Sequence, residues 1–186
     1  VLLHAIFNKA EPQILADAEA GELAAWINAN QWVIEYAVFK NIKRQNYHAS
    51  WKDWKECADM RAPSAAKITA AWNDPVLKRE HLFYAWVQMH LHKQLRKAVA
   101  YCADNGILIK GDIPILMNED SVEVWAHPEY FRSDLRAGSP PDGDNPTGQN
   151  WGFPIYNWAN LKATGYRWWK DRLLHASQYY LSLIHI

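Results

Sequence analysis

The stretch ILIKGDIPILMNEDSVEVWAHPEYF, residues 107–131, is the most informative part of this 186-residue chain. It opens with Ile107 to Ile109, an apolar run that we extend to Ile115 as a strand, and a short helical stretch follows around Val122 to Ala126. A strand that comes directly after a long helix and precedes a loop and another helix predicts a βαβ unit, a piece of an α/β fold. We expect the last six residues, LSLIHI, to form the second strand.

Three polar residues in this stretch are candidates for a functional site. Asp112 falls just past the apolar residues that open the predicted strand, which is where an α/β barrel carries its catalytic and binding residues. Asp120 and Ser121 follow, ahead of the short helix. For Asp120 and Ser121 the alternative is helix capping, with Glu123 in the first turn. For Asp112 the alternative is a structural carboxylate in a turn, and the sequence leaves both alternatives open.

The chain before residue 106 has a helical composition. It contains one of the eight glycines and three of the nine prolines, whereas residues 106–165 contain the other seven glycines and six prolines. Spacing of apolar residues predicts helices over Pro12–Asn28, Trp32–Gln45, a short segment capped by Ser50, Pro63 to about Trp72, Val76 to about Asp104, and Tyr166–Tyr180. The long helix would bury one face made of Phe83, Val87, Leu91, Leu95, Val99 and Cys102, and Asn105–Gly106 would end it in a left-handed turn.

Composition excludes several classes of protein. With 49% hydrophobic and 22% charged residues the chain is expected to fold, and its zero net charge argues against nucleic-acid binding. No apolar run reaches the roughly 18–20 residues that span a bilayer. The chain opens VLLHAIF, with neither an initiator Met nor a charged n-region, so no signal peptide is visible, and Val1 reads as an arbitrary cut. We interpret Cys57 and Cys102 as buried thiols in a reducing cytoplasm.

The motifs of several common active sites are missing from the sequence. His90 and His92 are two residues apart, so on a helix they do not share a face, and a solvated surface beside Lys93 and Lys97 is the better interpretation. The glycines of GQNWG, residues 148–152, lack the Lys and Ser/Thr of a phosphate loop. No Gly-x-Ser-x-Gly elbow occurs. These absences argue against a zinc site, a phosphate loop and serine-type acyl transfer.

The second informative segment is AGSPPDGDNPTGQNWGFPIYNW, residues 137–158. It is too long and too polar for a simple connection, so we expect a functional loop. It places the aromatic residues Trp151, Phe153, Tyr156 and Trp158 beside the polar residues Asp142, Asn145, Gln149 and Asn150. This mixture suits a sugar, which has an apolar face for stacking and a rim of hydroxyl groups that need hydrogen-bond partners. The alternative is that the aromatic residues only attach the loop to the core.

Several motifs, in order, resemble those of the 4-alpha-glucanotransferases (amylomaltases or disproportionating enzymes) of glycoside hydrolase family seventy-seven. They are HLFYAWVQMHLHKQL (81–95), GILIKGDIPI (106–115), EDSVEVWAHPEYF (119–131), SPPD (139–142), TGQNWGFPIYNW (147–158) and YRWW (166–169). The strong resemblance covers about Leu82 to Tyr180. It implies an α/β fold, a partial (β/α)8 TIM barrel of the α-amylase superfamily with a mostly helical N-terminal part.

The resemblance also implies a function. Members of the family cleave an α-1,4-glucan, hold the donor part covalently and pass it to another sugar, with the two carboxyl groups of a retaining glycosidase. The implied partners are α-1,4-glucans and maltooligosaccharides, with no cofactor, metal, nucleic acid or membrane, in the cytoplasm. Carried over by motif, the substrate-binding residues are Asp112, Asp120, Ser121, Asp142, Gln149, Trp151 and Tyr156. Trp151 is the candidate for glucan contact, Trp125, Trp158, Trp168 and Trp169 are framework, and the six earlier tryptophans pack in the core.

The C-terminal stretch departs from the family pattern. Where the family has Tyr-Phe-Asp-Ala-Tyr-Arg-Ile-Asp-His, with the nucleophile as the Asp before His, residues 179–186 read YYLSLIHI and contain neither Asp nor Arg. We therefore expect a truncated, inactive fragment with three parts: residues 1–105, mainly helical; 106–180, a strand-loop-helix unit with the glucan-binding loop; and 181–186, an atypical end foreign to the family. Some apolar surface should then lie exposed. The alternatives are a non-catalytic glucan-binding module and a helical interaction fragment whose aromatic residues are all core.

Overall fold

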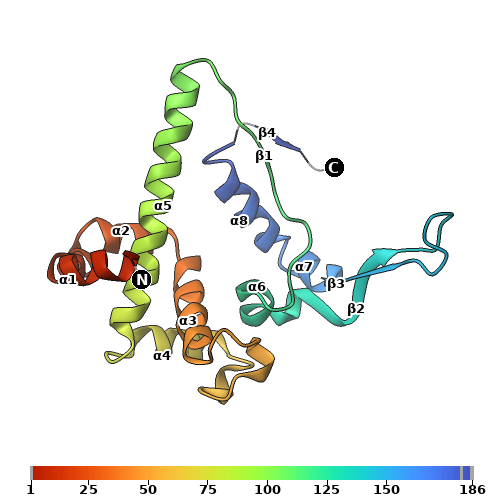
Figure 1. The fold of residues 1–186 in the computed structure, drawn as a ribbon, viewed down its shortest axis with the longest axis horizontal. Helices are drawn as coiled ribbons and strands as arrows, with labels where there is room; N and C mark the ends of the chain where they lie inside the picture. The colour runs from red at the N-terminus through yellow and green to blue at the C-terminus, as the bar shows by residue number, and fades with distance from the viewer. Residues whose placement is uncertain (1, 181, 185–186) are drawn as a thin grey trace. The chain divides into compact units, whose positions relative to one another are not determined.

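The computed structural model describes residues 2–180 and 182–184, and the chain divides into two compact units, residues 1–95 and 96–186 (Figure 1). Unit 1 contains α1 (Leu2–Ala20), α2 (Glu22–Ala29), α3 (Trp32–Gln45), the 3-10 turns η1 (Trp51–Asp53) and η2 (Ala58–Met60), and α4 (Ala65–Asn73). The long helix α5 (Lys78–Asp104) begins in unit 1 and ends in unit 2. Because this division lies within a helix, the domain boundaries expected at 105 and 180 stay predictions.

Unit 1 is helical and has an apolar core. Its fully buried side chains include Phe7, Leu23, Val33, Val38 and Trp54. The predictions for α3, α4 and α5 are confirmed, with α3 at the expected bounds. In α3, Phe39 and Ile42 are buried whereas Trp32 is exposed, so the expectation that the six earlier tryptophans pack in the core is wrong for Trp32.

The first predicted helix, Pro12–Asn28, is wrong in its bounds. Helix α1 runs from Leu2 to Ala20 through Pro12, and α2 starts afresh after Gly21. The carboxylate of Asp17 causes the break, because it accepts hydrogen bonds from the backbone N–H groups of Glu22 at 2.7 Å and Leu23 at 3.0 Å. A Cβ atom at residue 21 would lie 1.9 Å from the Asp17 carboxylate, so only glycine fits here.

The short helix predicted after Ser50 is also wrong. Only the single turn η1 forms, and the Ser50 side chain makes no capping hydrogen bond. Trp54 leaves the turn to enter the core, and Cys57 has a φ of 55°, which no helix continues. The prediction of buried thiols is wrong as well, since Cys57 is exposed and Cys102 is only half-buried.

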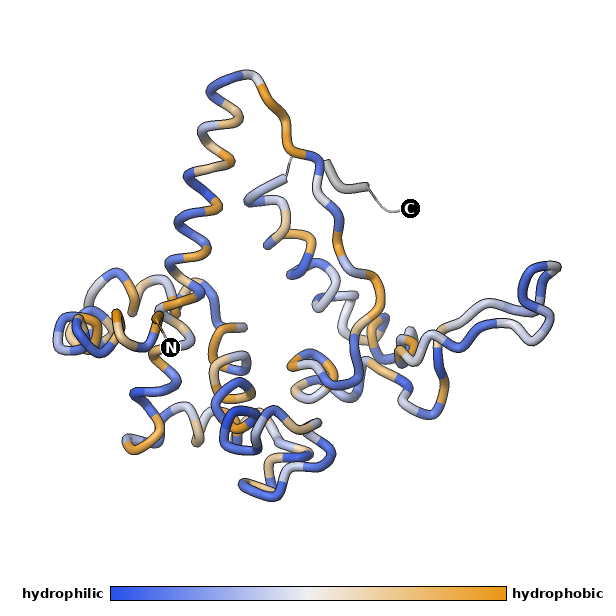
Figure 2. Tube along the Cα trace, viewed as in Figure 1, coloured by the Kyte–Doolittle hydropathy of each residue, from blue (hydrophilic) through white to orange (hydrophobic). Residues whose placement is uncertain are grey.

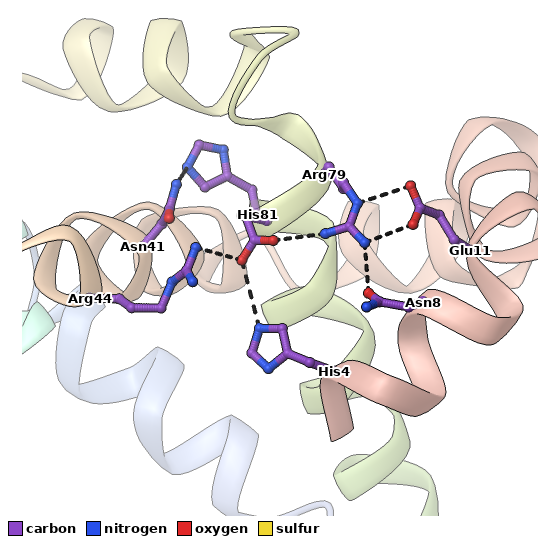
Figure 3. Close-up of polar contacts among 8 residues, drawn as sticks. His4, Asn8, Glu11, Asn41, Arg44, Arg79 and His81 are labelled. Carbon is purple, nitrogen blue, oxygen red and sulfur yellow. Dashed lines mark hydrogen bonds and ion pairs between the residues drawn. The ribbon is translucent and has the colours of Figure 1, made fainter. Parts of the chain in front are cut away.

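Electrostatic contacts join α1, α3 and the start of α5 within unit 1 (Figure 3). Arg79 donates to both carboxylate oxygens of Glu11, at 2.9 and 2.7 Å, and to the side-chain oxygen of Asn8. The neighbouring Glu80 pairs with Arg44 at 2.8 Å. These bidentate and paired contacts orient the first turn of α5 against the two other helices.

The long helix α5 is buried only along its first half. At 27 residues it is about 40 Å long, and its buried residues all lie between His81 and Met89. On the predicted apolar face Leu91 is 51% exposed and Leu95 is 41% exposed. The expectation that apolar surface lies exposed is thus confirmed. Figure 2 shows that the segment directly after α5 is also hydrophobic. Gly106, at a φ of 72°, ends the helix in the predicted left-handed turn.

Unit 2 contains a parallel strand pair. The strand β1 (Lys110–Asp112) pairs with β4 (Ser182–Ile184), with Lys110 opposite Ser182 and Asp112 opposite Ile184. This pairing confirms the predicted βαβ unit, but β1 is shorter than the expected Ile107–Ile115. Ile107 and Leu108 lie outside the strand and are exposed. Of the predicted atypical end, residues 181, 185 and 186 lie outside the described residues.

Between these strands the chain forms short helices and a hairpin. The helices are α6 (Val122–Ala126), the turn η3 (Pro128–Tyr130), α7 (Trp158–Ala163) and α8 (Arg167–Ala176), the last shorter than the predicted Tyr166–Tyr180. The segment expected to be a loop is instead an antiparallel hairpin of β2 (Phe131–Ser139) and β3 (Gln149–Tyr156), which Figure 1 shows as an extended ribbon. Gly138 permits this pairing, because a Cβ atom there would lie 1.9 Å from the Gln149 carbonyl oxygen.

Aromatic rings form the core of unit 2. Trp168 contacts the rings of Phe131 and Tyr156, each at 5.7 Å between centroids. Among the predicted framework residues, Trp125 and Trp168 are buried, whereas Trp158 is 57% exposed. Within residues 2–180 and 182–184, every helix is too short or too polar to cross a membrane.

Candidate functional site

The site predicted at Asp112 lies at the carboxyl end of a parallel strand pair. Asp112 is the last residue of β1, its side chain is exposed, and one carboxylate oxygen accepts the N–H of the adjacent Ile113 at 2.7 Å. In parallel α/β architectures ligands bind at the carboxyl ends of the strands, because the loops that follow the strands gather there. Asp112 therefore has both the exposure and the position that a binding carboxylate needs.

Asp120 and Ser121 stand at the start of α6. The Ser121 hydroxyl oxygen accepts the N–H of Val124 at 3.4 Å, so the capping alternative is confirmed for Ser121. A capping hydroxyl keeps its own O–H, which remains able to donate to a ligand. Asp120 is half-buried, and its N–H donates to the side-chain oxygen of Asn118 at 2.8 Å. The turn that precedes α6 thus has a defined conformation.

The hairpin holds the other predicted residues in three different environments. One carboxylate oxygen of Asp142 accepts the N–H groups of Asp144 and Asn145, at 2.9 and 2.7 Å, so this side chain shapes the hairpin tip. Gln149 and Trp151 are brought together, because the indole N–H of Trp151 donates to Oε1 of Gln149 at 2.7 Å. Trp151 is 48% exposed, which leaves part of its ring available for stacking.

Tyr156 lies in the core of unit 2 rather than on its surface. It is 8% exposed, and its hydroxyl group donates to the carbonyl oxygen of Ile115 at 2.5 Å. Burial raises the pKa of Tyr156, which keeps the hydroxyl protonated as a donor. For this residue the structure agrees with the alternative that the aromatic residues attach the hairpin to the core, whereas Trp151 is the exposed member of the set.

Sequence reasoning missed two arginines that contact the stretch between Asp112 and Asp120. Arg136 of β2 donates to both carboxylate oxygens of Glu119, at 3.0 and 3.1 Å. Arg172 of α8 donates to the carbonyl oxygen of Pro114 at 2.7 Å. The only local signal was that Arg172 falls four residues after a tryptophan on the same helix face. Nothing in the sequence identified the carbonyl that it contacts.

The histidines of α5 form no metal site. In the part of the chain that the structure describes, no group of three or more His, Cys, Asp or Glu side chains could hold a metal ion. The expectation of a solvated face is wrong for the two imidazoles, which are half-buried against aromatic rings: His90 lies 4.7 Å from Trp86 and His92 lies 6.0 Å from Trp26, between ring centroids. Burial lowers the pKa of His90 accordingly.

Comparison with solved structures identifies the class of protein to which this fold corresponds. Amylomaltase from Streptococcus agalactiae, solved in complex with acarbose, superposes with a TM-score of 0.80 at 30% identity, over 96% of this chain and 37% of that one. The chain belongs to the 4-alpha-glucanotransferase family, whose profile matches residues 1–184. The family indicated by the sequence motifs is thus confirmed.

Curated relatives agree with this assignment. The 4-alpha-glucanotransferase of Synechocystis sp. is 39% identical over 164 residues, which cover 84% of this chain and 32% of the relative. The 4-alpha-glucanotransferase of Chlamydia pneumoniae is 36% identical over 150 residues, covering 80% and 27% respectively. The chain therefore spans about a third of the length of these relatives.

Proposed function

We propose that this chain is part of a 4-alpha-glucanotransferase that transfers α-1,4-glucan segments between maltooligosaccharides in the cytoplasm, and that it contributes the glucan-binding side of a (β/α)8 barrel. The observation that carries the proposal is the placement of Asp112 at the carboxyl end of the parallel pair β1–β4. Family membership and the similarity to an amylomaltase solved with acarbose support the choice of an α-glucan as ligand.

The chemistry we propose is the retaining double displacement. A carboxylate nucleophile would take the donor sugar, a carboxylic acid would protonate the leaving oxygen, and a sugar hydroxyl would then replace water as acceptor. Residues 179–186, YYLSLIHI, offer no carboxylate side chain for the nucleophile. We therefore assign binding rather than bond cleavage to this chain, and expect the 186 residues alone to leave maltotriose unchanged in a disproportionation assay.

Binding is proposed to divide between two groups of residues. Asp112, Asp120 and Ser121 would accept and donate hydrogen bonds to sugar hydroxyl groups at the strand end. On the hairpin, the ring of Trp151 would stack on a glucose face. Gln149 supports this role, because its hydrogen bond to the indole N–H restricts the orientation of the ring before the sugar arrives.

A titration of the 186-residue chain with maltoheptaose, followed by tryptophan fluorescence, tests the proposal. Trp151→Ala should weaken binding about tenfold or more, in the range of a lost aromatic stacking contact, while the thermal midpoint stays unchanged because the side chain is half exposed. The matched control is Trp158→Ala, which removes another exposed indole and should leave the affinity unchanged.

Each alternative function has its own outcome in this titration. Unfolding of Trp151→Ala would favour the helical interaction fragment, in which all aromatic residues are core. A second outcome would favour a non-catalytic glucan-binding module. In it, the chain binds maltoheptaose tightly but shows no disproportionation activity, even when it is fused to the remaining part of a related enzyme. Equal affinity of the Trp151→Ala and wild-type chains would overturn the role of Trp151.

A further inference from the structure

Arg172 occupies an unusual environment on α8. Its guanidinium group lies 4.6 Å from the ring centroid of Trp168 and 4.9 Å from that of Trp169. One terminal nitrogen donates to the Pro114 carbonyl oxygen at 2.7 Å. Burial lowers the pKa of Arg172, against the opposing effect of Tyr156 and Glu123. The cation thus packs against two adjoining indoles and has a backbone carbonyl as an acceptor.

The carbonyl groups of two successive residues are held from two different elements. Arg172 of α8 takes the carbonyl of Pro114, and the hydroxyl of Tyr156 on β3 takes that of Ile115. These residues follow the end of β1, where the ladder hydrogen bonds stop. Carbonyl groups outside a sheet would otherwise turn to water, so the two side chains determine the path of the backbone here.

A third contact holds the far end of the same segment. The carboxylate of Glu119 receives two hydrogen bonds from Arg136 on β2. Residues 113–119, which separate Asp112 from Asp120, are therefore held at three points by side chains from β2, β3 and α8. Two of the three points are arginines, whose planar guanidinium can make directed hydrogen bonds while it stacks on an indole.

We propose that Arg172 is a positioning residue that, packed against Trp168 and Trp169, sets the path of residues 113–119 and thereby the spacing of the glucan-binding carboxylates Asp112 and Asp120. This inference rests on the proposed function, because it assigns a consequence for sugar binding to a contact that does not itself touch sugar. Lysine is not equivalent to Arg172, because its ammonium group is a point charge that lacks the planar fork of donors of the guanidinium.

NMR spectroscopy of the 186-residue chain tests the positioning directly. Arg172→Met and Arg172→Lys should both shift the carbonyl ¹³C resonance of Pro114, and should lower the order parameters of residues 113–119 from about 0.85 toward values below about 0.6. Tyr156→Phe should act on Ile115 instead. The matched control is Arg167→Met on the same helix, whose side chain is 82% exposed and pairs with Asp171 at 3.7 Å.

Maltoheptaose titration supplies the functional arm. Arg172→Met should weaken binding about tenfold, Arg172→Lys should weaken it as well, and Arg167→Met should leave it unchanged. If Arg172→Met unfolds unit 2, the proposal is tested with Arg172→Lys and Tyr156→Phe instead. If Arg172→Lys has the order parameters and the affinity of the wild type, the positive charge is sufficient, and the role proposed for the planar guanidinium is overturned.

The two proposals fail in different ways. If the order parameters of residues 113–119 and the carbonyl ¹³C shift of Pro114 are unchanged in the Arg172 variants, the positioning role is overturned, whether or not the affinity for maltoheptaose changes. Mobility gained in residues 113–119 without loss of affinity would also overturn it. A wild-type chain that does not bind maltoheptaose, while the Arg172 variants still free the segment, would overturn the proposed function and leave the hold of Arg172 on the segment supported.

Discussion

Acidification should destabilise unit 1 through one residue, His81. This imidazole is fully buried on α5, stacks on Trp72 with ring centroids 5.9 Å apart, and faces the side-chain amide of Asn41 at 3.2 Å. The amide donates to the ring, which requires an unprotonated nitrogen. The pKa of His81 is lowered from 6.5 to about 4, mainly by burial and then by the charge of Lys78, against a hydrogen bond to the Trp72 backbone and the charges of Asp74 and Glu80.

The sign and size follow from proton linkage. At a pH between about 4 and 6.5, the imidazole of His81 is protonated in the unfolded chain but neutral in the folded chain. The free energy of unfolding therefore falls as the pH falls through this window, and the contribution of His81 is fully present above it. A difference of about 2.5 units corresponds to about 3 kcal/mol at most. About 2 kcal/mol of that should be lost between about pH 7.5 and about pH 5.

The assay compares urea unfolding of the wild type and His81→Gln across this range, with a direct NMR titration of the imidazole. Glutamine keeps an acceptor oxygen for Asn41 but does not titrate, so the pH dependence of the difference isolates His81 from the carboxylates. The reasoning is refuted if His81 titrates near 6.5, or if the stability of His81→Gln declines with acid as steeply as that of the wild type.

Three further substitutions test other parts of the structure. Trp125→Ala, at a side chain 1% exposed, should cost about 3–5 kcal/mol in chemical denaturation of unit 2. Gly111→Ala would place a Cβ atom 2.2 Å from the Tyr180 ring, so it should destabilise the β1–β4 pair by about 1–3 kcal/mol, with rescue by Tyr180→Ala, as NMR cross-strand contacts would report. Ser121→Ala removes the acceptor for Val124 and should lower stability by about 1 kcal/mol in the same denaturation assay.

Each of these has a contrary result. A Trp125→Ala chain as stable as the wild type would mean that the unit 2 core is held elsewhere. Failure of Tyr180→Ala to rescue Gly111→Ala would place the conflict in the backbone rather than the ring. Ser121→Asp serves as the control for the cap, because it should retain the stability that alanine loses.

The predictions from sequence were most accurate where the signal was local. The helix over Trp32–Gln45, the cap at Ser121 and the left-handed end at Gly106 depend on neighbouring residues only, and the structure has all three. The motifs around Asp112 likewise identified the family. The bounds of α1 failed because the signal was a side chain, Asp17, reaching across a turn to cap the next helix.

Burial was harder to predict than helicity. The spacing of Leu91 and Leu95 correctly indicated one face of α5, but both are exposed, since periodicity reports which side is apolar and not what covers it. The hairpin β2–β3 was missed for a related reason. Its glycines and prolines indicate turns, whereas its pairing depends on the close approach of Gly138 to the Gln149 backbone.

The sequence by itself determined the family, the helical character of the first part and the candidate residues Asp112, Asp120, Ser121 and Trp151, because these depend on residue types in a fixed order. Only the tertiary structure decided which of them lie exposed and what holds them. Arg172 contacts a carbonyl 58 residues away, and Tyr156 one 41 residues away. Every residue has the same backbone carbonyl group, so no sequence pattern indicates which carbonyl a distant side chain will hydrogen-bond.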